Sequence, residues 1–169
     1  MTRKQRFLIA VLGAIAWIAV DQFTKAWFKQ ILTPGDMMSL LAGSLLVLPT
    51  YNHGAFLSLG AGMSNAMRSL VFIFGVSAIL IGLLVWFVRS NRPSWVAVIA
   101  IASIWSGGLS NLFDRCVYDD RVFDFLNIGI GGLRTGVFNF SDVGIMFGLV
   151  LILFSRCWFK PTPSESATA

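Results

Sequence analysis

Four long hydrophobic stretches, separated by polar loops, dominate the pattern along the chain. An α-helix rises about 1.5 Å per residue, so about 20 apolar residues cross the roughly 30 Å hydrocarbon layer of a membrane. The stretches of suitable length are 7–28, 70–88, 95–113 and 138–155. The second and third contain no charged residue. The pattern therefore predicts an all-α membrane protein with four transmembrane helices, in a single domain over residues 1–160.

The composition agrees with this class of protein. Hydrophobic residues make up 56% of the chain and charged residues only 12%, whereas about 25% of a soluble domain is charged. This excludes a disordered chain, a collagen-like repeat and an ordinary soluble enzyme. One His and two Cys are too few for a disulfide scaffold or for a zinc site of Cys and His ligands, and no metal is expected.

Lysine and arginine are distributed unevenly between the loops. The segments before the first stretch, between the second and third, and after the fourth carry seven cations against Glu165 alone, a formal charge of +6. The other segments carry six cations against seven Asp, which gives −1 and agrees with the net charge of +5. Cationic loops stay in the cytoplasm, so we predict that both termini are cytoplasmic, with a disordered tail at 161–169. The net positive charge is then explained by the membrane topology, and nucleic acid is not an expected partner.

The first stretch has an alternative interpretation as a cleaved signal peptide. It has a basic start, an apolar run and a small-residue cleavage pattern at Ala14-Ile15-Ala16. Cleavage there would leave Asp21 and Lys25 at a new terminus and only three spans.

Two long loops are predicted to face outward, at 29–69 and 114–137. In the first, 44–59 has the pattern of two apolar strands around Tyr51-Asn52-His53-Gly54, with Pro49 weakening the first strand or placing it at an edge. The second loop is rich in Asp and Arg, and its four glycines favour a tight return of the chain. Long loops on a small membrane protein usually carry function.

Carboxylates gather at the predicted outer boundary of the membrane. Asp21, Asp114 and Asp142 lie at the ends of predicted helices, and Asp124 lies in a loop between two phenylalanines. Two close carboxyl groups cannot both ionise cheaply, so they share a proton. One then activates water and the other protonates a carbonyl oxygen, which is peptide hydrolysis without Ser, Cys or metal.

Other roles for these residues stay open at this point. Asp21 and Lys25 form an i,i+4 pair, Asp114 beside Arg115 fits a structural pair, and the acidic pair at 119–120 fits a solvated loop. A Ser–Lys nucleophile fits the residue types without support from spacing. An intramembrane Asp also suits a proton-coupled transporter, although the second and fourth stretches have uncharged midplanes and no repeat is visible.

Five ordered motifs resemble those of the lipoprotein signal peptidase (signal peptidase II) family, bacterial membrane aspartyl peptidases with four spans. The similarity covers nearly the whole chain. The motifs are Asp21-Gln22-Phe23-Thr24-Lys25, Tyr51-Asn52-His53-Gly54-Ala55-Phe56, Asn111-Leu112-Phe113-Asp114-Arg115, Phe123-Asp124-Phe125 and Phe138-Asn139-Phe140-Ser141-Asp142.

The resemblance implies a role for each matching residue. Asp124 and Asp142 correspond to the family's catalytic aspartates, while Asp21 and Lys25 stabilise the fold. The residues implied to support the pair or to hold substrate are Asn52, Gly54, Asn111, Asp114, Arg115 and Asn139.

The resemblance also implies a reaction and a place for it. The family removes signal peptides from diacylglyceryl-modified prolipoproteins, cleaving before the lipidated Cys at the outer face of the bacterial inner membrane. A small β-sheet cradle in the first outer loop, no metal or organic cofactor, contact with membrane lipid and a monomeric state are expected. A small proton-coupled transporter and a non-catalytic paralogue acting as a membrane scaffold are the alternatives.

The chain departs from the family pattern at three positions. Phe56 changes the end of the second motif, Ser110 replaces a glycine, and Ser141 places a hydroxyl beside Asp142. These departures bear on substrate specificity. A related question concerns Ser103, Ser106, Ser110 and Asn111, which suit either a substrate groove or close packing of small residues between helices.

Overall fold

The computed structural model describes residues 2–54, 62–90 and 94–158, and side chains as far as Phe154. Each of the four hydrophobic stretches corresponds to a helical segment, although the fourth begins two residues before its helix, α5. The first, third and fourth segments are α1, α4 and α5. The second begins as α2, continues through the π-helical η3 and ends as α3. The bounds are α1 Arg3–Ile31, α2 Asn65–Arg68, η3 Ser69–Gly75, α3 Val76–Arg89, α4 Trp95–Val117 and α5 Phe140–Trp158.

Three helical segments, Arg3–Ile31, Asn65–Arg89 and Trp95–Val117, are long and apolar enough to cross a membrane, and Phe140–Phe154 is a shorter apolar helix. Their outward faces are apolar: Phe74 on η3 is 66% exposed. An exposed apolar surface of this extent is expected where lipid rather than water surrounds the helices.

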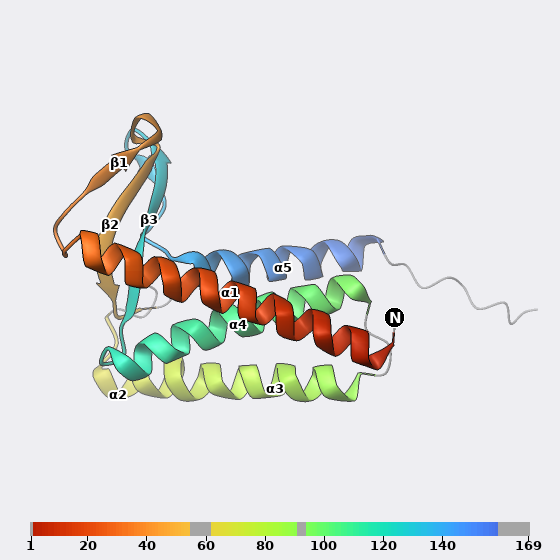
Figure 1. The fold of residues 1–169 in the computed structure, drawn as a ribbon. Helices are drawn as coiled ribbons and strands as arrows, with labels where there is room; N and C mark the ends of the chain where they lie inside the picture. Colours follow the sequence, from red (N-terminus) through yellow and green to blue (C-terminus); the bar gives the residue numbers. More distant parts are fainter. Residues whose placement is uncertain (1, 55–61, 91–93, 159–169) are drawn as a thin grey trace, which may run out of the picture.

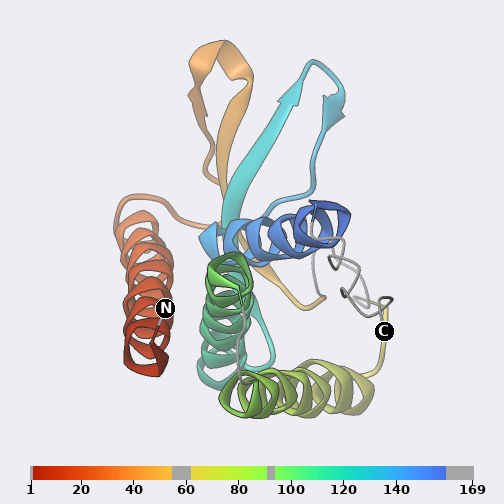
Figure 2. The same cartoon turned by 90° about the vertical axis from the view of Figure 1, so that its right-hand side faces the viewer.

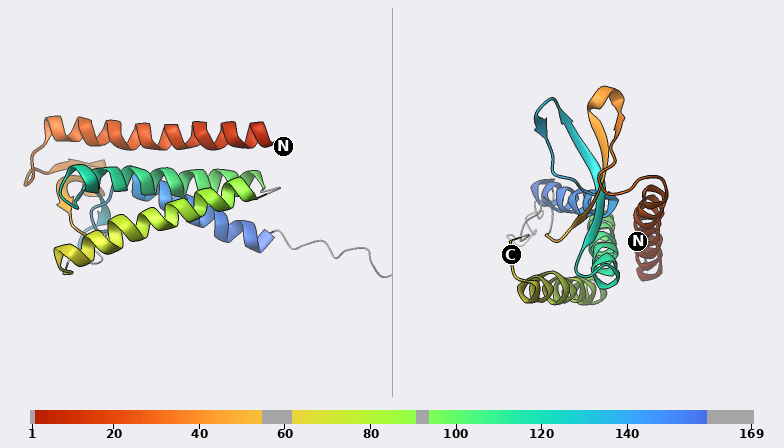
Figure 3. Two further views of the ribbon diagram at one scale, coloured as in Figure 1. Left: turned by 90° about the horizontal axis from the view of Figure 1, so that it is seen from below. Right: turned by 90° about the vertical axis from the view of Figure 1, so that its left-hand side faces the viewer.

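Helix α4 is the centre of the bundle. Figures 2 and 3 show α1, α3 and α5 arranged around it. The approach of α5 is closest, because a Cβ added to Gly107 would lie 2.5 Å from the carbonyl oxygen of Ser141, and one added to Gly148 would lie 2.5 Å from that of Ala100. Only glycine permits such backbone contact, so the start of α5 is held firmly against α4.

A four-stranded antiparallel sheet stands at the end of the bundle opposite the N-terminus (Figure 1). Its order is β1-β2-β3-β4, and the first pair is joined by the short helix η1. The bounds are β1 Met38–Leu40, η1 Leu41–Gly43, β2 Leu45–Asn52, β3 Val122–Ile130 and β4 Leu133–Arg134. The sheet expected in the first loop is therefore present, but it also contains two strands from the second loop, β3 and β4.

Strand β2 decides between the two expectations for Pro49. It lies between β1 and β3 rather than at an edge. Its register with β3 shifts between Val47 and Thr50, and a bulge of this kind accommodates Pro49, which has no N–H to donate. The second strand expected within 44–59 falls largely on 55–61, outside the described residues.

A small aromatic core fixes the orientation of β3. Val47, Phe123 and Phe125 are buried together, and the ring of Phe125 lies 4.7 Å from that of Phe28 on α1. Because side chains alternate along a strand, burying Phe123 and Phe125 on one face turns Asp124 toward the other. The apolar pattern around Asp124 thus determines where its carboxyl group points.

Candidate active site

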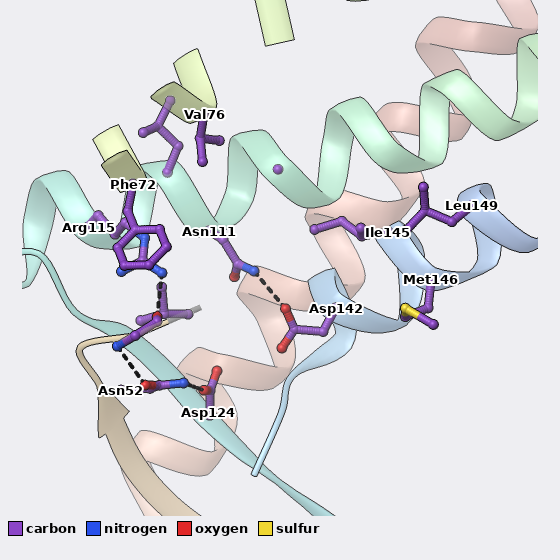
Figure 4. Close-up of a pocket in the computed structure, with 14 residues that line it drawn as sticks. Asn52, Phe72, Val76, Asn111, Arg115, Asp124, Asp142, Ile145, Met146 and Leu149 are labelled. Carbon is purple, nitrogen blue, oxygen red and sulfur yellow. Dashed lines mark hydrogen bonds between the residues drawn. The ribbon is translucent and has the colours of Figure 1, made fainter. Parts of the chain in front are cut away.

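A pocket of about 340 Å³ lies where the sheet meets η3, α4 and α5, at the end of the bundle opposite the N-terminus. Figure 4 shows the carboxyl groups of Asp124 and Asp142 turned toward the same part of it, the first from β3 and the second from the start of α5. The polar side chains that line it are those of Asn52, Asn111, Arg115, Asp124 and Asp142, and Gly54 also lines it.

Asp124 lies in strand β3, paired with Thr50, rather than in the loop that the sequence suggested. It is 2% exposed. Its Oδ2 accepts a hydrogen bond from Asn52 Nδ2 at 2.9 Å, and its Oδ1 accepts one from Asn139 Nδ2 at 2.7 Å. Both oxygens are thus held by neutral amide donors, and within the part of the chain that the structure describes Asp124 forms no ion pair.

Asp142 is fixed by the N-terminus of α5. Asn139 Oδ1 accepts a hydrogen bond from the Asp142 N–H at 3.0 Å, and the Asn139 N–H donates to Asp142 Oδ2 at 3.1 Å. This reciprocal arrangement is a capping box, so Asn139 caps the helix. The other oxygen, Oδ1, accepts from Asn111 Nδ2 at 3.0 Å.

Asn139 and Asn111 connect the two carboxyl groups. Asn139 Nδ2, which donates to Asp124, also donates to Asn111 Oδ1 at 3.1 Å, and Lys25 Nζ donates to the same oxygen at 3.1 Å. A lysine ammonium can only donate, so the atom of Asn111 that faces it must be the carbonyl oxygen. The NH₂ group of Asn111 is therefore turned toward Asp142.

A buried ion triad lies directly behind the pocket. Lys25 Nζ lies 2.7 Å from Asp21 Oδ2 and 3.0 Å from Asp114 Oδ2, and all three side chains are at most 1% exposed. Asp21 also accepts from Ser110 Oγ at 2.7 Å and from the Ser141 N–H at 2.9 Å. The triad thus ties α1 to α4 and α5, and Asp114 lies in it rather than in the pocket lining.

Asp114 also holds strand β3. Its Oδ2 accepts a hydrogen bond from the backbone N–H of Phe123 at 3.1 Å, and its Oδ1 accepts one from Gln22 Nε2 at 3.1 Å. Phe123 precedes Asp124, so this contact anchors the strand one residue from the pocket. Gln22 was not among the predicted site residues, although it lies inside the first motif.

Arg115 points away from Asp114 and holds the loop after β2. Its Nη2 donates to the carbonyl oxygen of Gly54 at 2.7 Å, and its Nη1 donates to that of Asp120 at 3.0 Å. The Gly54 N–H in turn donates to Asn52 Oδ1 at 2.8 Å. Asn52 is therefore oriented from both ends of its amide, with its Nδ2 left to face Asp124.

The surroundings of Asp124 change the pKa of its carboxyl group from that of an ordinary aspartate. Burial, and then the nearby charge of Asp142, raises the pKa of Asp124 to about 7, against the opposing effect of the hydrogen bonds from Asn52 and Asn139. Near neutral pH, Asp124 therefore exchanges its proton readily. A carboxyl group that carries a proton beside one that is ionised can act as acid and base in hydrolysis.

The remaining wall of the pocket is apolar. Ile145, Met146 and Leu149 follow Asp142 at helical spacing along α5, and Phe72 and Val76 face them from η3 and α3. The sequence analysis did not single out these residues, although the i+3, i+4 and i+7 spacing from Asp142 was a usable signal.

The serines of α4 pack between helices rather than line the pocket. Ser103 Oγ accepts from Trp17 Nε1 at 2.9 Å, and Ser106 donates to the Ser103 carbonyl oxygen at 3.1 Å. Ser110 donates to Asp21. Of the four polar residues considered on this helix, only Asn111 lines the pocket.

Two further expectations concern Ser141 and the acidic pair after α4. The Ser141 hydroxyl is buried and has no hydrogen-bond partner among the described residues, so it forms no hydrogen bond with either pocket carboxylate. The Asp119 side chain is 94% exposed. Asp120, expected to be solvated, instead accepts a hydrogen bond from Ser69. Phe56 lies outside the described residues.

No group of three or more His, Cys, Asp or Glu side chains arranged to hold a metal ion occurs within residues 2–54, 62–90 and 94–154.

Comparison with known proteins gives consistent matches over most of the chain. The sequence model of a family described as signal peptidase (SPase) II matches residues 13–158. A lipoprotein signal peptidase of Hydrogenovibrio crunogenus is 33% identical over 156 residues, which cover 91% of this chain and 88% of the relative. One of Ralstonia nicotianae is 34% identical over 145 residues, covering 86% and 81%.

Solved structures show the same architecture. One, described as a bacterial membrane enzyme determined by the in meso method, superposes with a TM-score of 0.80 at 25% identity, covering 95% of this chain and 94% of the other. A second with the same description has a TM-score of 0.78 at 26% identity, covering 89% and 94%.

Proposed function

The chain belongs to the signal peptidase II family, a family of membrane-embedded peptidases that act on lipoprotein precursors, and from this premise we propose that Asp124 and Asp142 are its catalytic pair. The resemblance drawn from the five motifs is confirmed, and the protein is a multi-pass membrane peptidase. The proposal is supported chiefly by one observation: both carboxyl groups line one pocket and are held there by the same residue, Asn139.

In the proposed mechanism the ionised carboxylate takes a proton from a water molecule, which attacks the carbonyl carbon of the scissile peptide bond. The protonated carboxyl group donates its proton to the carbonyl oxygen, so that a neutral tetrahedral intermediate forms. Collapse of this intermediate breaks the C–N bond: one carboxyl group donates its proton to the leaving amine, while the other carboxylate takes a proton from a hydroxyl group of the intermediate. The pair therefore again holds one shared proton. Asn52, Asn111 and Asn139 hold the carboxyl oxygens in position throughout.

The apolar wall supports the proposed substrate, a prolipoprotein cleaved before a diacylglyceryl-modified Cys. Ile145, Met146 and Leu149 face Phe72 and Val76 across the pocket, and such a surface suits lipid chains or an apolar signal peptide. A lipidated substrate stays anchored at the membrane surface, where water also reaches the carboxyl groups. All of the proposed residues come from one chain, so we propose that it acts as a monomer.

The substrate proposal can be tested with purified protein and a matched pair of precursors. A diacylglyceryl-modified prolipoprotein is expected to be cleaved, and the same precursor with Ser in place of the modified Cys is expected to remain intact. Equal cleavage of both precursors would contradict the lipid requirement. Cleavage of neither would favour a transporter or a scaffold.

We further propose that all four helical segments cross the membrane, with both termini in the cytoplasm and the pocket at the outer face of the bacterial inner membrane. Arg3, Lys4 and Arg6 begin α1 and Arg89 ends α3, at the opposite end of the bundle from the sheet (Figure 1). Cations gather on the cytoplasmic side.

The topology predicts opposite locations for two reporter fusions. A periplasm-active reporter is expected to work when fused after Ser64, and a cytoplasm-active reporter when fused after Ser90. These residues cap opposite ends of the helical segment Asn65–Arg89. Activity of the same reporter at both positions would contradict this topology.

The pKa of Asp124 predicts how cleavage depends on pH. Asp124 holds its proton below about pH 7 and loses it above. If Asp124 supplies the shared proton, the cleavage rate should therefore fall as the pH rises through about 7. Asn52→Ala removes a hydrogen bond that favours the ionised form, so the pKa of Asp124 should rise and the fall should move to higher pH.

The full pH profile of the cleavage rate, measured for folded wild type and for Asn52→Ala, checks this prediction. Asp119→Asn is the control and should leave the profile unchanged, because the Asp119 side chain lies in solvent. A shift of the Asn52→Ala profile to lower pH would contradict the assignment of the proton to Asp124.

A further inference from the structure

A second cavity lies at the other end of the bundle, far from the pocket of Asp124 and Asp142. Figures 2 and 3 show α1 and α3 approaching α4 from two sides, and an apolar groove of about 240 Å³ runs between them over α4. Six of the side chains that line it are Ala10, Ala14, Leu84, Phe87, Ile101 and Trp105. Small residues on α1 leave room that a bulky side chain would fill.

The groove continues into a wider depression of about 830 Å³ at the N-terminus of α1. Phe7, Val11, Phe87 and Val88 line both cavities, so the two are continuous. The rim of the wider part is cationic and consists of Arg3, Lys4 and Arg6. The combined shape is thus a narrow apolar channel that opens beneath three positive charges.

These cations lack compensating anions among the residues that the structure describes. The first turn of α1 contains no acidic residue, and none of the three cations forms an ion pair there. The Nε of Arg6 is buried and has no hydrogen-bond partner among the described residues. All three also stand at the positive end of the α1 dipole, where cations are unfavourable and an anion is favourable.

We propose that this cavity binds one anionic diacyl phospholipid, with its phosphate among Arg3, Lys4 and Arg6 and an acyl chain in the groove between α1 and α3. The apolar groove distinguishes a lipid from a free anion, since only a lipid gains from burying hydrocarbon there. The three cations distinguish an anionic headgroup from a zwitterionic one. With the proposed topology the lipid belongs to the cytoplasmic leaflet; the binding itself does not depend on the peptidase mechanism.

Lipid retention by purified protein tests the proposal. Full-length protein in a nonionic detergent is mixed with dimyristoyl phosphatidylglycerol, with dimyristoyl phosphatidylcholine or with glycerol phosphate. Bound molecules are counted by native mass spectrometry, and the unfolding temperature is recorded. We expect one phosphatidylglycerol to be retained and to raise the unfolding temperature, with little effect of the other two. Equal retention of both lipids, or full competition by equimolar glycerol phosphate, would overturn the proposal.

Two matched pairs of variants locate the site. Arg6→Gln should weaken phosphatidylglycerol binding about fivefold, whereas Arg89→Gln removes the same charge from the same end of the bundle, outside the cavity, and should change binding less than about twofold. Ala10→Phe should block the groove, whereas Leu12→Phe adds bulk at an exposed position of α1. All four variants should keep cleaving substrate in lipid-free micelles, which shows that they are folded. Equal weakening within either pair would contradict the assigned site.

Discussion

Asp124→Asn and Asp142→Asn are each expected to reduce cleavage of a lipidated precursor about 10³-fold or more, because a proton exchange of this kind contributes on the order of 10²–10⁴ and an amide cannot take part in it. Asn nearly preserves the shape of Asp. Each substitution leaves one donor unmatched, since every carboxyl oxygen of the pair accepts an N–H. Each substitution also removes a buried charge. We therefore expect folded variants that still bind substrate.

Asp119→Asn is the matched control for these substitutions. Its side chain is 94% exposed, and its φ of 52° lies in the left-handed region that Asn tolerates well. Its cleavage rate should stay within about twofold of wild type, as expected for a surface change. A comparable loss in Asp119→Asn, measured per folded molecule, would show that the assay reports general disruption rather than loss of the pair.

Lys25→Met is expected to lower the free energy of unfolding by about 3–5 kcal/mol, the usual effect of removing one partner from a buried ion group. Without Lys25, the carboxylates of Asp21 and Asp114 face each other in a buried site with no cation between them. Asp21→Asn should be milder, because Lys25 and Asp114 then remain as a neutral pair and the Asn oxygen can still accept the Ser141 N–H.

The measurement is the yield of folded protein and its unfolding temperature in detergent, together with cleavage per folded molecule. Asp21→Asn should lower the yield more than the turnover, and Asp119→Asn should change neither. Normal yield of Asp21→Asn with lost turnover would contradict the structural role and would move Asp21 into the reaction.

The helices were accessible from sequence because their signals are local, whereas Asp124 and Asp142 were separated from the other boundary aspartates by the family resemblance. A continuous apolar run such as 70–88 predicts a helix regardless of its neighbours. Asp124, between two buried phenylalanines, is marked by the cost of burying a charge. The cap of α5 is equally local, because Asn139 lies three residues before Asp142.

The sheet was only partly predictable because its pairing joins distant segments. Asn52 pairs with Val122 although two helical segments lie between them in the sequence, and no periodicity within either loop indicates that partner. This long separation is why the sheet was expected in the first loop without strands from the second. It also explains the misplacement of Asp124, whose strand is recognisable only beside β2.

The ion triad shows a similar limit. The sequence predicts Lys25 as the i,i+4 partner of Asp21, and this pair is present. The second contact, to Asp114 on α4, depends on how helices pack. Asp114 and Arg115 are adjacent in sequence but point in different directions, one toward α1 and β3, the other toward the loop at Gly54. Adjacency alone suggested a pair that the helix geometry separates.

The most direct test of the central claim is a double-mutant cycle on Asp124 and Asp142. The single variants and the double variant Asp124→Asn/Asp142→Asn are compared by the cleavage rate of lipidated substrate, per folded molecule at one pH below 7. If the two carboxyl groups share one proton and act as a unit, each single variant loses nearly all activity and the double variant is little worse. Losses that multiply in the double variant, or substantial activity in Asp142→Asn, would contradict the catalytic pair.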